Sequence, residues 1–198
     1  MMNFTRILLA LLFLQMSAFA QERAHTQDPA LSINFFLVDF ETATKIRSST
    51  LSSVLNNKQF GKIKEMSPGL AVAYSNGLSS HFDFSTTLAG SFLNDPRTNA
   101  SSSGGDNLLL EADASIRGKM FSNNYWFTPY VQLGVGASKY KGYYGAFVPI
   151  GVGLQLNLFD EAFLLVNSQY RIPVTESANY HFYHSIGLAG NIGKRKSK

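Results

Sequence analysis

Apolar and polar residues alternate with a period of two along most of the chain beyond residue 30. In the first such run, Leu31 and Ile33 are separated by Ser32. Runs of this kind lie at 31–37, 70–74, 82–90, 107–119, 127–137, 148–158, 162–172 and 180–192. A period of two is typical of β-strands with one apolar face. Beyond the N-terminus no run approaches the 18 or so consecutive apolar residues of a membrane-spanning helix.

The run NLLLEADASIRGK, residues 107–119, places charged residues inside this pattern. Glu111, Asp113 and Arg117 alternate with alanine and isoleucine. In a soluble sheet such residues would face solvent. The rest of the chain favours a different location for them.

The connections between the runs alternate in length. Those at 75–80, 118–124 and 159–161 are short, whereas those at 41–67, 93–106, 139–146 and 173–179 are longer. Short turns at one end and longer loops at the other are typical of outer-membrane barrels, whose tilted strands need about 9–11 residues to cross a bilayer. We therefore predict an all-β protein, an eight-stranded antiparallel up-and-down transmembrane β-barrel at residues 30–193.

The two faces of the expected strands differ in polarity. One face is almost free of charge, and the other is rich in Asn, Gln, Ser and Thr with few lysines. Only 15% of all residues are charged, against roughly 25% in an average soluble domain. A lipid-facing exterior with a polar interior explains both observations. Glu111, Asp113 and Arg117 are therefore expected to point into the barrel.

Carboxylates inside a narrow barrel need cationic partners, because an isolated buried charge is costly. Eight strands leave no room for an aqueous channel, so side chains fill the interior. We predict an interior polar network of Asp83, Glu111, Asp113, Arg117, Gln169 and Arg171. Its expected role is to satisfy a polar core, with a gate as the alternative. Inward glycines at 134, 136, 151 and 153 are expected to make room for larger groups such as Tyr130, Arg171 or Tyr183.

Aromatic residues gather where the expected strands end, as in the girdles of membrane barrels. On the turn side we expect Tyr125, Trp126, Phe127 and Phe159 in such a girdle. On the loop side we expect Tyr143, Tyr144, Phe147, Tyr180 and Phe182. The alternative is the ordinary enrichment of aromatics in strands.

The N-terminus carries the pattern of a secretory signal peptide. Arg6 precedes an apolar run at 7–14, and residues 17–20 end in an A-x-A sequence. We expect residues 1–20 to be a cleaved signal peptide, followed by a short segment at 21–29, the barrel, and a basic tail at 194–198. The expected location is the outer membrane.

Composition excludes several kinds of site. The chain has no cysteine, so disulfides and thiolate sites are impossible. The net charge of +4 comes largely from the C-terminal tail and the segment 45–64, without the basic and aromatic patches of nucleic-acid binders. We expect no cofactor, no metal site and no nucleic-acid partner.

Nearly all of residues 30–194 resembles the N-terminal eight-stranded barrel of OmpA-like outer-membrane proteins, particularly those of Bacteroidota. The runs that carry the resemblance are LSSVLNNKQFGKIKEMSPGLAV (51–72), DNLLLEADASIRGKMF (106–121), GVGASKYKGYYGAFVPIGVGLQLNLFDEAFLLVNSQYRIPVT (134–175) and YHFYHSIGLAGNIGK (180–194). The resemblance implies a structural, membrane-anchoring role, with narrow-pore activity as a further expectation. The expected partners are outer-membrane lipids and the barrel-insertion machinery, and the expected state is a monomer.

Two departures from that family limit what is carried over. The sequence ends at Lys198, so we expect no peptidoglycan-binding domain here. Such barrels commonly finish on an aromatic residue read by the insertion machinery, whereas here the last strand runs into Gly193 and the basic tail.

The first long connection is rich in lysine. Lys58, Lys62 and Lys64 are expected to contact anionic lipid headgroups if this loop lies outside the cell. A merely solvated loop is the alternative.

Two other functional classes stay open. A soluble, secreted barrel of the lipocalin kind would bind an apolar ligand and would have an apolar lumen. A barrel enzyme acting on outer-leaflet lipid would need a nucleophile, a base and an orienting acid together. His184 and Ser185 fall on opposite faces of one strand, and His181 is expected as a solvated or girdle residue at the rim. We assign no catalytic residues and expect no enzymatic activity.

Overall fold

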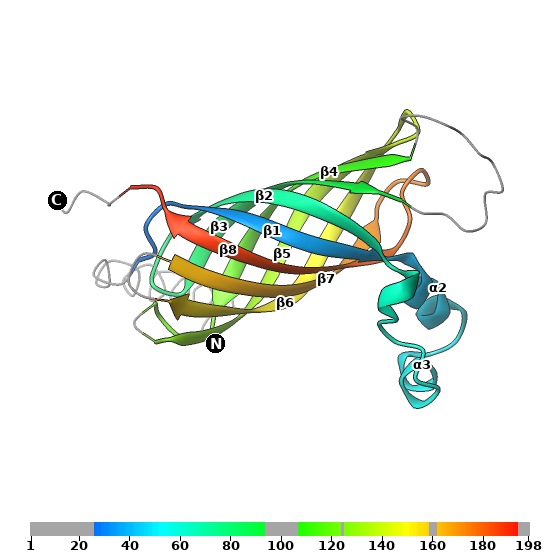
Figure 1. Cartoon of the computed structure of the whole chain (residues 1–198), viewed down its shortest axis with the longest axis horizontal. Helices are drawn as coiled ribbons and strands as arrows, with labels where there is room; N and C mark the ends of the chain where they lie inside the picture. The colour runs from blue at the N-terminus through cyan, green and yellow to red at the C-terminus, as the bar shows by residue number, and fades with distance from the viewer. Residues whose placement is uncertain (1–25, 94–106, 124, 159–161, 194–198) are drawn as a thin grey trace, which may run out of the picture.

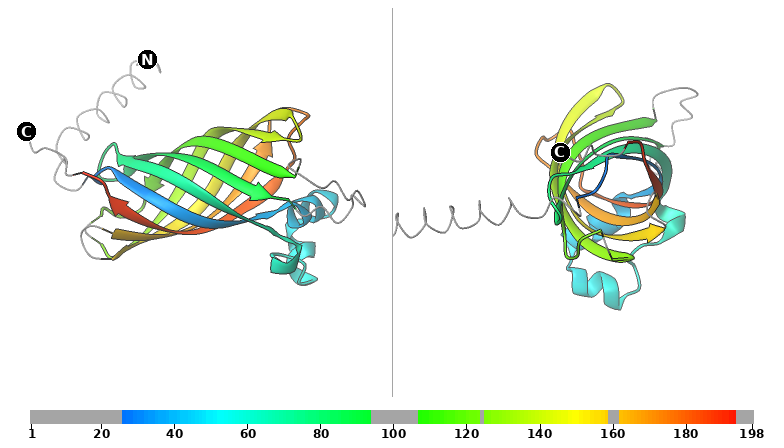
Figure 2. Two further views of the ribbon diagram at one scale, coloured as in Figure 1. Left: turned by 45° about the horizontal axis from the view of Figure 1, so that its top comes forward. Right: turned by 90° about the vertical axis from the view of Figure 1, so that its left-hand side faces the viewer.

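Eight antiparallel strands close into a barrel in the computed structural model, which describes residues 26–93, 107–123, 125–158 and 162–193 (Figure 1). The strands are β1 (Ala30–Asp39), β2 (Ser67–Gly77), β3 (Phe82–Phe92), β4 (Leu108–Lys119), β5 (Phe127–Tyr140), β6 (Tyr143–Leu158), β7 (Ala162–Pro173) and β8 (His181–Asn191). Each strand pairs with its neighbours in sequence, and β1 pairs with β8 to complete the ring (Figure 2). The predicted eight-stranded, antiparallel, up-and-down barrel is confirmed. The expected signal peptide and basic tail lie outside the described residues.

Side chains alternate between the lumen and the outer wall, as the sequence pattern predicts. In β1, Ile33 is 67% exposed on the outer wall, whereas the adjacent Asn34 is buried in the lumen. The same alternation places large apolar side chains over the whole wall. Exposed members of this apolar belt are Leu31, Ile33, Phe35, Leu70, Val72, Leu88, Ile116, Val131, Leu133, Val135, Ile150, Val152, Val166, Ile186 and Leu188.

The lumen is polar but not uniformly so. One apolar cluster of buried residues comprises Phe36, Val38, Ala71, Ala89, Leu109 and Tyr183. A smaller one comprises Ala30, Phe163, Leu165 and Ala189. Alternation alone does not predict the first cluster, because residues 35–38 read Phe-Phe-Leu-Val and are apolar on both faces.

The two ends of the barrel carry different connections. The end that we call the turn end holds the connections at 78–81 and 120–126, and there Ala30 pairs with Asn191. The opposite end, the loop end, holds longer connections at 40–66 and 174–180. The prediction of a long loop at 139–146 is wrong. Lys141 and Gly142, both with positive φ (47° and 82°), form a two-residue turn between β5 and β6, so the strands continue through most of that range.

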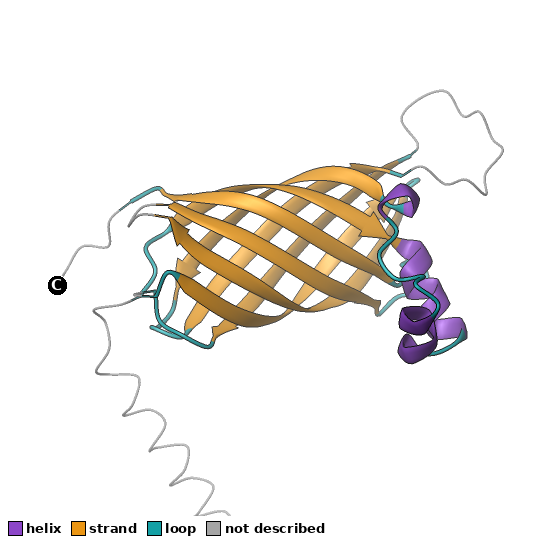
Figure 3. Ribbon diagram, turned by 60° about the horizontal axis from the view of Figure 1, so that its bottom comes forward, coloured by secondary structure: helices purple, strands orange, loops and turns teal. Residues whose placement is uncertain are grey.

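The connection at 40–66, called the arm below, is helical rather than irregular (Figure 3). It contains α2 (Phe40–Ser48), α3 (Leu51–Asn56) and a 3₁₀ turn at Ile63–Glu65. Side-chain caps begin both α-helices: Asp39 Oδ1 accepts from the Thr42 N–H at 2.8 Å, and Thr50 Oγ1 accepts from the Ser53 N–H at 3.2 Å. Within the described part of the chain, these helices are too short and too polar to cross a membrane.

Candidate functional site

The buried charges of the lumen gather near its two ends. The group nearer the loop end, called the loop-side cluster, consists of Glu111, Asp113, Gln169, Arg171 and His181. The group nearer the turn end, called the turn-side cluster, consists of Asp83, Arg117, Lys119, Asn123 and Tyr130. The sequence predicts one network, whereas the structure separates Asp83 and Arg117 from Arg171.

Arg171 of β7 is the centre of the loop-side cluster. Its guanidinium reaches across the lumen to β4, where Nη1 lies 2.5 Å from Glu111 Oε2 and Nη2 lies 3.2 Å from Asp113 Oδ2. Gln169 Oε1 accepts weaker bonds from Nε and Nη2 of the same arginine, both at 3.4 Å. Because β4 and β7 are not neighbours in the sheet, this side chain ties opposite walls of the barrel together.

Two aromatic rings enclose the Arg171 guanidinium. Its Cζ lies 4.1 Å from the centre of the Tyr183 ring and 4.8 Å from that of Phe147. The Phe147 ring in turn fills the space above Gly136, its direct partner on β5, where any Cβ would clash with it. Cation–π contacts of this kind are stronger where water is excluded. The expectation that Phe147 belongs to the girdle is wrong, because strand alternation turns its side chain into the lumen, where it is 2% exposed.

His181 was expected at the solvated rim, but the structure buries it in the loop-side cluster. It pairs with Arg171 across the β7–β8 ladder. Its Nε2 lies 3.2 Å from Glu111 Oε1, and its Nδ1 lies 2.9 Å from the Asn179 carbonyl oxygen. Both ring nitrogens therefore face acceptors, which leaves neither of them to activate a serine hydroxyl.

The turn-side cluster depends on a cation that the sequence analysis did not identify. Lys119 Nζ lies 2.9 Å from Asp83 Oδ2 and donates to Asn123 Oδ1 at 2.9 Å. The sequence analysis places a turn at 118–124 and so leaves Lys119 out of the strand, whereas β4 keeps its alternation as far as Lys119. Continuing the inward series at 111, 113, 115 and 117 by one step would have found it.

Arg117, also of the turn-side cluster, is directly opposite Asp83 on β3. Its Cζ is 5.3 Å from the centre of the Tyr130 ring. Tyr130 lies over Gly153, its partner on β6, as Phe147 lies over Gly136. The glycines therefore make room for inward aromatic rings, among them the expected Tyr130.

The charges of the lumen balance. Among the buried strand residues described, Asp83, Glu111 and Asp113 face Arg117, Lys119 and Arg171, three acids against three bases, with His181 beside them. Asp39 is also buried, but its carboxylate caps α2. Lys119 and Arg171 form ion pairs with these three acids, and Arg117 lies opposite Asp83. This closeness of opposite charges offsets the large desolvation penalty of burying them.

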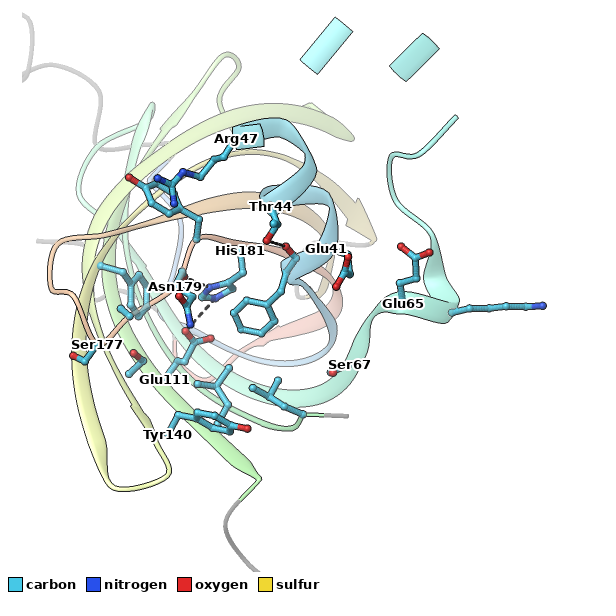
Figure 4. A pocket seen from close by; sticks show the side chains of 18 residues that line it. Glu41, Thr44, Arg47, Glu65, Ser67, Glu111, Tyr140, Ser177, Asn179 and His181 are labelled. Carbon is cyan, nitrogen blue, oxygen red and sulfur yellow. Dashed lines mark hydrogen bonds and ion pairs between the residues drawn. The ribbon is translucent and has the colours of Figure 1, made fainter. Parts of the chain in front are cut away.

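Above the loop-side cluster lies a cavity of about 610 Å³. Figure 4 shows Glu111 and His181 in contact in this cavity, with Thr44 and Arg47 of the arm across it. Arg47 is held over the Tyr180 ring, with Cζ 3.9 Å from the ring centre. The lining mixes aromatic, hydroxyl and charged groups, and it includes Glu111 and His181 of the loop-side cluster.

The remaining residues expected in the girdles lie near the strand ends. Tyr125, Trp126 and Phe127 are exposed at the turn end, and Tyr143 and Tyr144 are each 71% exposed at the loop end. Tyr180 and Phe182 are partly buried, because the arm packs against them. Phe159 lies outside the described residues.

The structure assembles no catalytic triad from the residues weighed in the sequence. His184 faces outward and its Nδ1 lies 2.9 Å from the hydroxyl of Ser168, whereas Ser185 belongs to the inward face, opposite the buried Asn167. Among the described residues no group of three or more His, Cys, Asp or Glu side chains is placed to hold a metal ion.

No family model and no curated protein sequence matches the chain. Solved structures do resemble it. The outer-membrane protein OprG from Pseudomonas aeruginosa superposes with a TM-score of 0.52 and 10% identity, over 86% of this chain and 98% of OprG. The attachment invasion locus protein Ail of Yersinia pestis gives 0.50 and 12%, over 83% of this chain and 97% of Ail. The N-terminal β-barrel domain of Pseudomonas aeruginosa OprF gives 0.48 and 11%, over 83% and 98%. The likeness establishes the fold that this chain shares with OprG and Ail.

Proposed function

We propose that this protein is an outer-membrane β-barrel with a structural, membrane-anchoring role, a closed lumen and no enzymatic activity. The observation that carries the proposal is the polarity of the closed barrel. Large apolar side chains cover the outside, whereas the lumen of the described strands buries Asp83, Glu111, Asp113, Arg117, Lys119 and Arg171. In water this arrangement would expose the apolar belt, whereas in a bilayer both faces have the environment they need.

The same polarity argues against a soluble barrel that binds an apolar ligand. Such a protein needs an apolar lumen and a charged exterior. Here the lumen holds fully buried Arg171 and Glu111, and the apolar clusters beside them are filled by packed side chains. The fold shared with OprG and Ail, both outer-membrane barrels, supports the same conclusion.

A narrow pore is the second candidate, because a cavity of about 610 Å³ opens at the loop end. Buried ion pairs lie in the lumen at two levels beneath it, at Arg171, which reaches across from β7 to β4, and at Lys119, which pairs with Asp83 on the adjacent strand. An ion would have to displace both, and removing one partner of a buried pair costs about 3–5 kcal/mol. We therefore favour a closed barrel over a conducting one. A monomer inserted by the barrel-insertion machinery, with membrane lipids as its partners, fits this role.

The first test is heat modifiability in the native membrane. The outer-membrane fraction is extracted in mild detergent and run on SDS gels with and without boiling. We expect the protein in this fraction, with a faster-migrating unboiled band that marks a closed, detergent-resistant barrel. Protein free in the periplasm or medium, without a shift, would overturn the proposal in favour of the soluble barrel.

Planar-bilayer recordings separate the closed barrel from the pore. We expect no steady conductance from the wild-type protein. Steady unitary steps that change when Arg171 is replaced would establish the narrow pore instead.

A further inference from the structure

The arm does not simply close the mouth of the barrel. In Figures 1 and 2, α3 lies to the side of the barrel at the loop end, beyond the outline of its wall. The chain after α3 then returns to the wall from outside. The Phe60 ring centre lies 5.6 Å from that of Phe182 and 6.5 Å from that of His184, both on the outward face of β8. The arm therefore lies against the same face of the barrel as the apolar belt.

Exposed apolar side chains of the arm extend this belt. Leu51 and Leu55, four residues apart in α3, share one side of the helix and are 49% and 53% exposed. Ile63 is 71% exposed. Large apolar side chains grouped on a short polar segment mark an interaction surface. Their continuity with Phe60 on the outer wall makes the bilayer the surface that they meet.

The charges of the same segment are complementary to an anionic surface. Lys58, Lys62 and Lys64 are all exposed. The other two cations of the arm are engaged, since Lys45 is hydrogen-bonded to Glu65 at 2.8 Å and Arg47 lies over the Tyr180 ring. Lys62 is 3.7 Å from Glu65, and among the described residues neither Lys58 nor Lys64 has an ion-pair partner. Lys58 and Lys64 are thus free to turn toward headgroups, and Lys62 is held only by this longer contact with Glu65.

We propose that residues 51–64 form a foot that rests on the leaflet at the loop end of the barrel and binds its anionic headgroups. Leu51, Leu55 and Ile63 enter the interface, while the three lysines extend toward headgroup phosphates. Each lysine near an anionic membrane surface raises the affinity for that surface roughly five-fold. The proposal of a foot depends on the proposed function, because it requires the barrel to span that membrane.

Tryptophan fluorescence of the full-length protein, folded in lipid vesicles, tests the foot. In a Trp126→Phe background, Leu55→Trp reports on the foot and Leu188→Trp on the belt. Val174→Trp is the matched control, since Val174 is 68% exposed in the connection before β8. Lipids brominated near the carbonyl end of the acyl chain serve as the quencher. We expect quenching at positions 55 and 188 but not at 174.

The lysines are tested in vesicles with and without an anionic phospholipid. The triple variant K58Q/K62Q/K64Q, carrying Leu55→Trp, should lose roughly ten-fold or more in the ratio of docked to free foot in anionic vesicles. It should change little in zwitterionic ones.

The outcomes separate this proposal from the function beneath it. Quenching at 188 without quenching at 55 would overturn the foot and leave the membrane barrel standing. Quenching at neither position would overturn the membrane barrel itself. Equal quenching at 55 in both vesicle types, unchanged in the triple variant, would overturn the assignment to anionic headgroups.

Discussion

The two charged clusters of the lumen use different chemistry to bury similar charges. In the loop-side cluster, the planar guanidinium of Arg171 contacts two carboxylates and lies between two aromatic rings. In the turn-side cluster, the ammonium of Lys119 contacts one carboxylate and the Asn123 amide oxygen. The arginine fork suits several fixed acceptors at once, whereas lysine acts as a compact point charge.

This difference sets how much of the barrel depends on each cation. Loss of Arg171 would leave both Glu111 and Asp113 without their shared partner. Loss of Lys119 would leave Asp83 close to Arg117, which lies directly opposite it on the neighbouring strand. The loop-side cluster therefore depends mainly on Arg171, whereas in the turn-side cluster Arg117 is a second cation near Asp83.

The largest effect is expected for Arg171→Met. The substitution keeps an unbranched side chain but takes the arginine away from two buried carboxylates, so the free energy of unfolding should fall by about 3–5 kcal/mol. Urea unfolding in vesicles, followed by the gel shift of the unboiled band, measures the change. The triple variant R171M/E111Q/D113N should recover at least half of the loss, because it also removes the two buried negative charges. A loss below about 1 kcal/mol would mean that the pair behaves like a hydrated surface pair.

Lys119→Met should have a smaller effect. Because Arg117 lies opposite Asp83, we expect the free energy of unfolding to fall by about 2 kcal/mol, less than for a buried charge with no cation near it. The same unfolding measurement applies, and D83N/K119M should restore most of the stability. If K119M proves as damaging as R171M, the comparison between the clusters is wrong.

Two glycines sharpen the comparison at the level of packing. Gly136 leaves room for the Phe147 ring beside Arg171, and Gly153 leaves room for the Tyr130 ring beside Arg117. Alanine at either position displaces the ring, at about 1–3 kcal/mol for overpacking, and G136A should be the more harmful because its ring supports Arg171. Gly90→Ala is the control, since its Cβ would lie 3.6 Å from Leu110 Cδ2 in ordinary contact. Equal midpoints for G136A and G90A in urea would contradict this account.

How far the sequence predicts these clusters follows from the strand period. Alternation places Glu111, Asp113 and Arg171 in the lumen, because it needs only the phase of each strand. It fails where the strand ends are misjudged, as at Lys119 and His181, which were assigned to a turn and to the rim. Which cation meets which carboxylate depends on the stagger between distant strands, and no local pattern carries that information.

The arm shows a different limit. Its helices are too short for periodicity to stand out, although Asp39 and Thr50 carry the capping chemistry that begins them. A search for capping residues just before the expected loop and within it would have indicated both. The placement of Phe60 on the outer wall follows from tertiary contacts with β8 and has no sequence signal of its own.

The smallest effect is expected for the exposed pair of Lys45 and Glu65, which extends the comparison to a pair in water. The hydrogen bond from Lys45 lowers the pKa of the Glu65 carboxyl below its ordinary value of 4.5. A lowered pKa in the folded state means that the pair stabilises the arm above that value, and that the contribution is lost as pH falls through the folded-state pKa. Acidification should therefore loosen the arm while the unboiled barrel band stays unchanged.

Nuclear magnetic resonance of the Glu65 side-chain carboxyl carbon follows this titration directly. Lys45→Met should move its midpoint upward, toward the ordinary value. Lys62→Met is the matched control and should move it less, because Lys62 Nζ is 3.7 Å from the carboxylate against 2.8 Å for Lys45. If both variants leave the midpoint in place, the pair does not order the arm in solution, and packing of Phe60 and Arg47 against β8 and Tyr180 must hold it against the barrel alone.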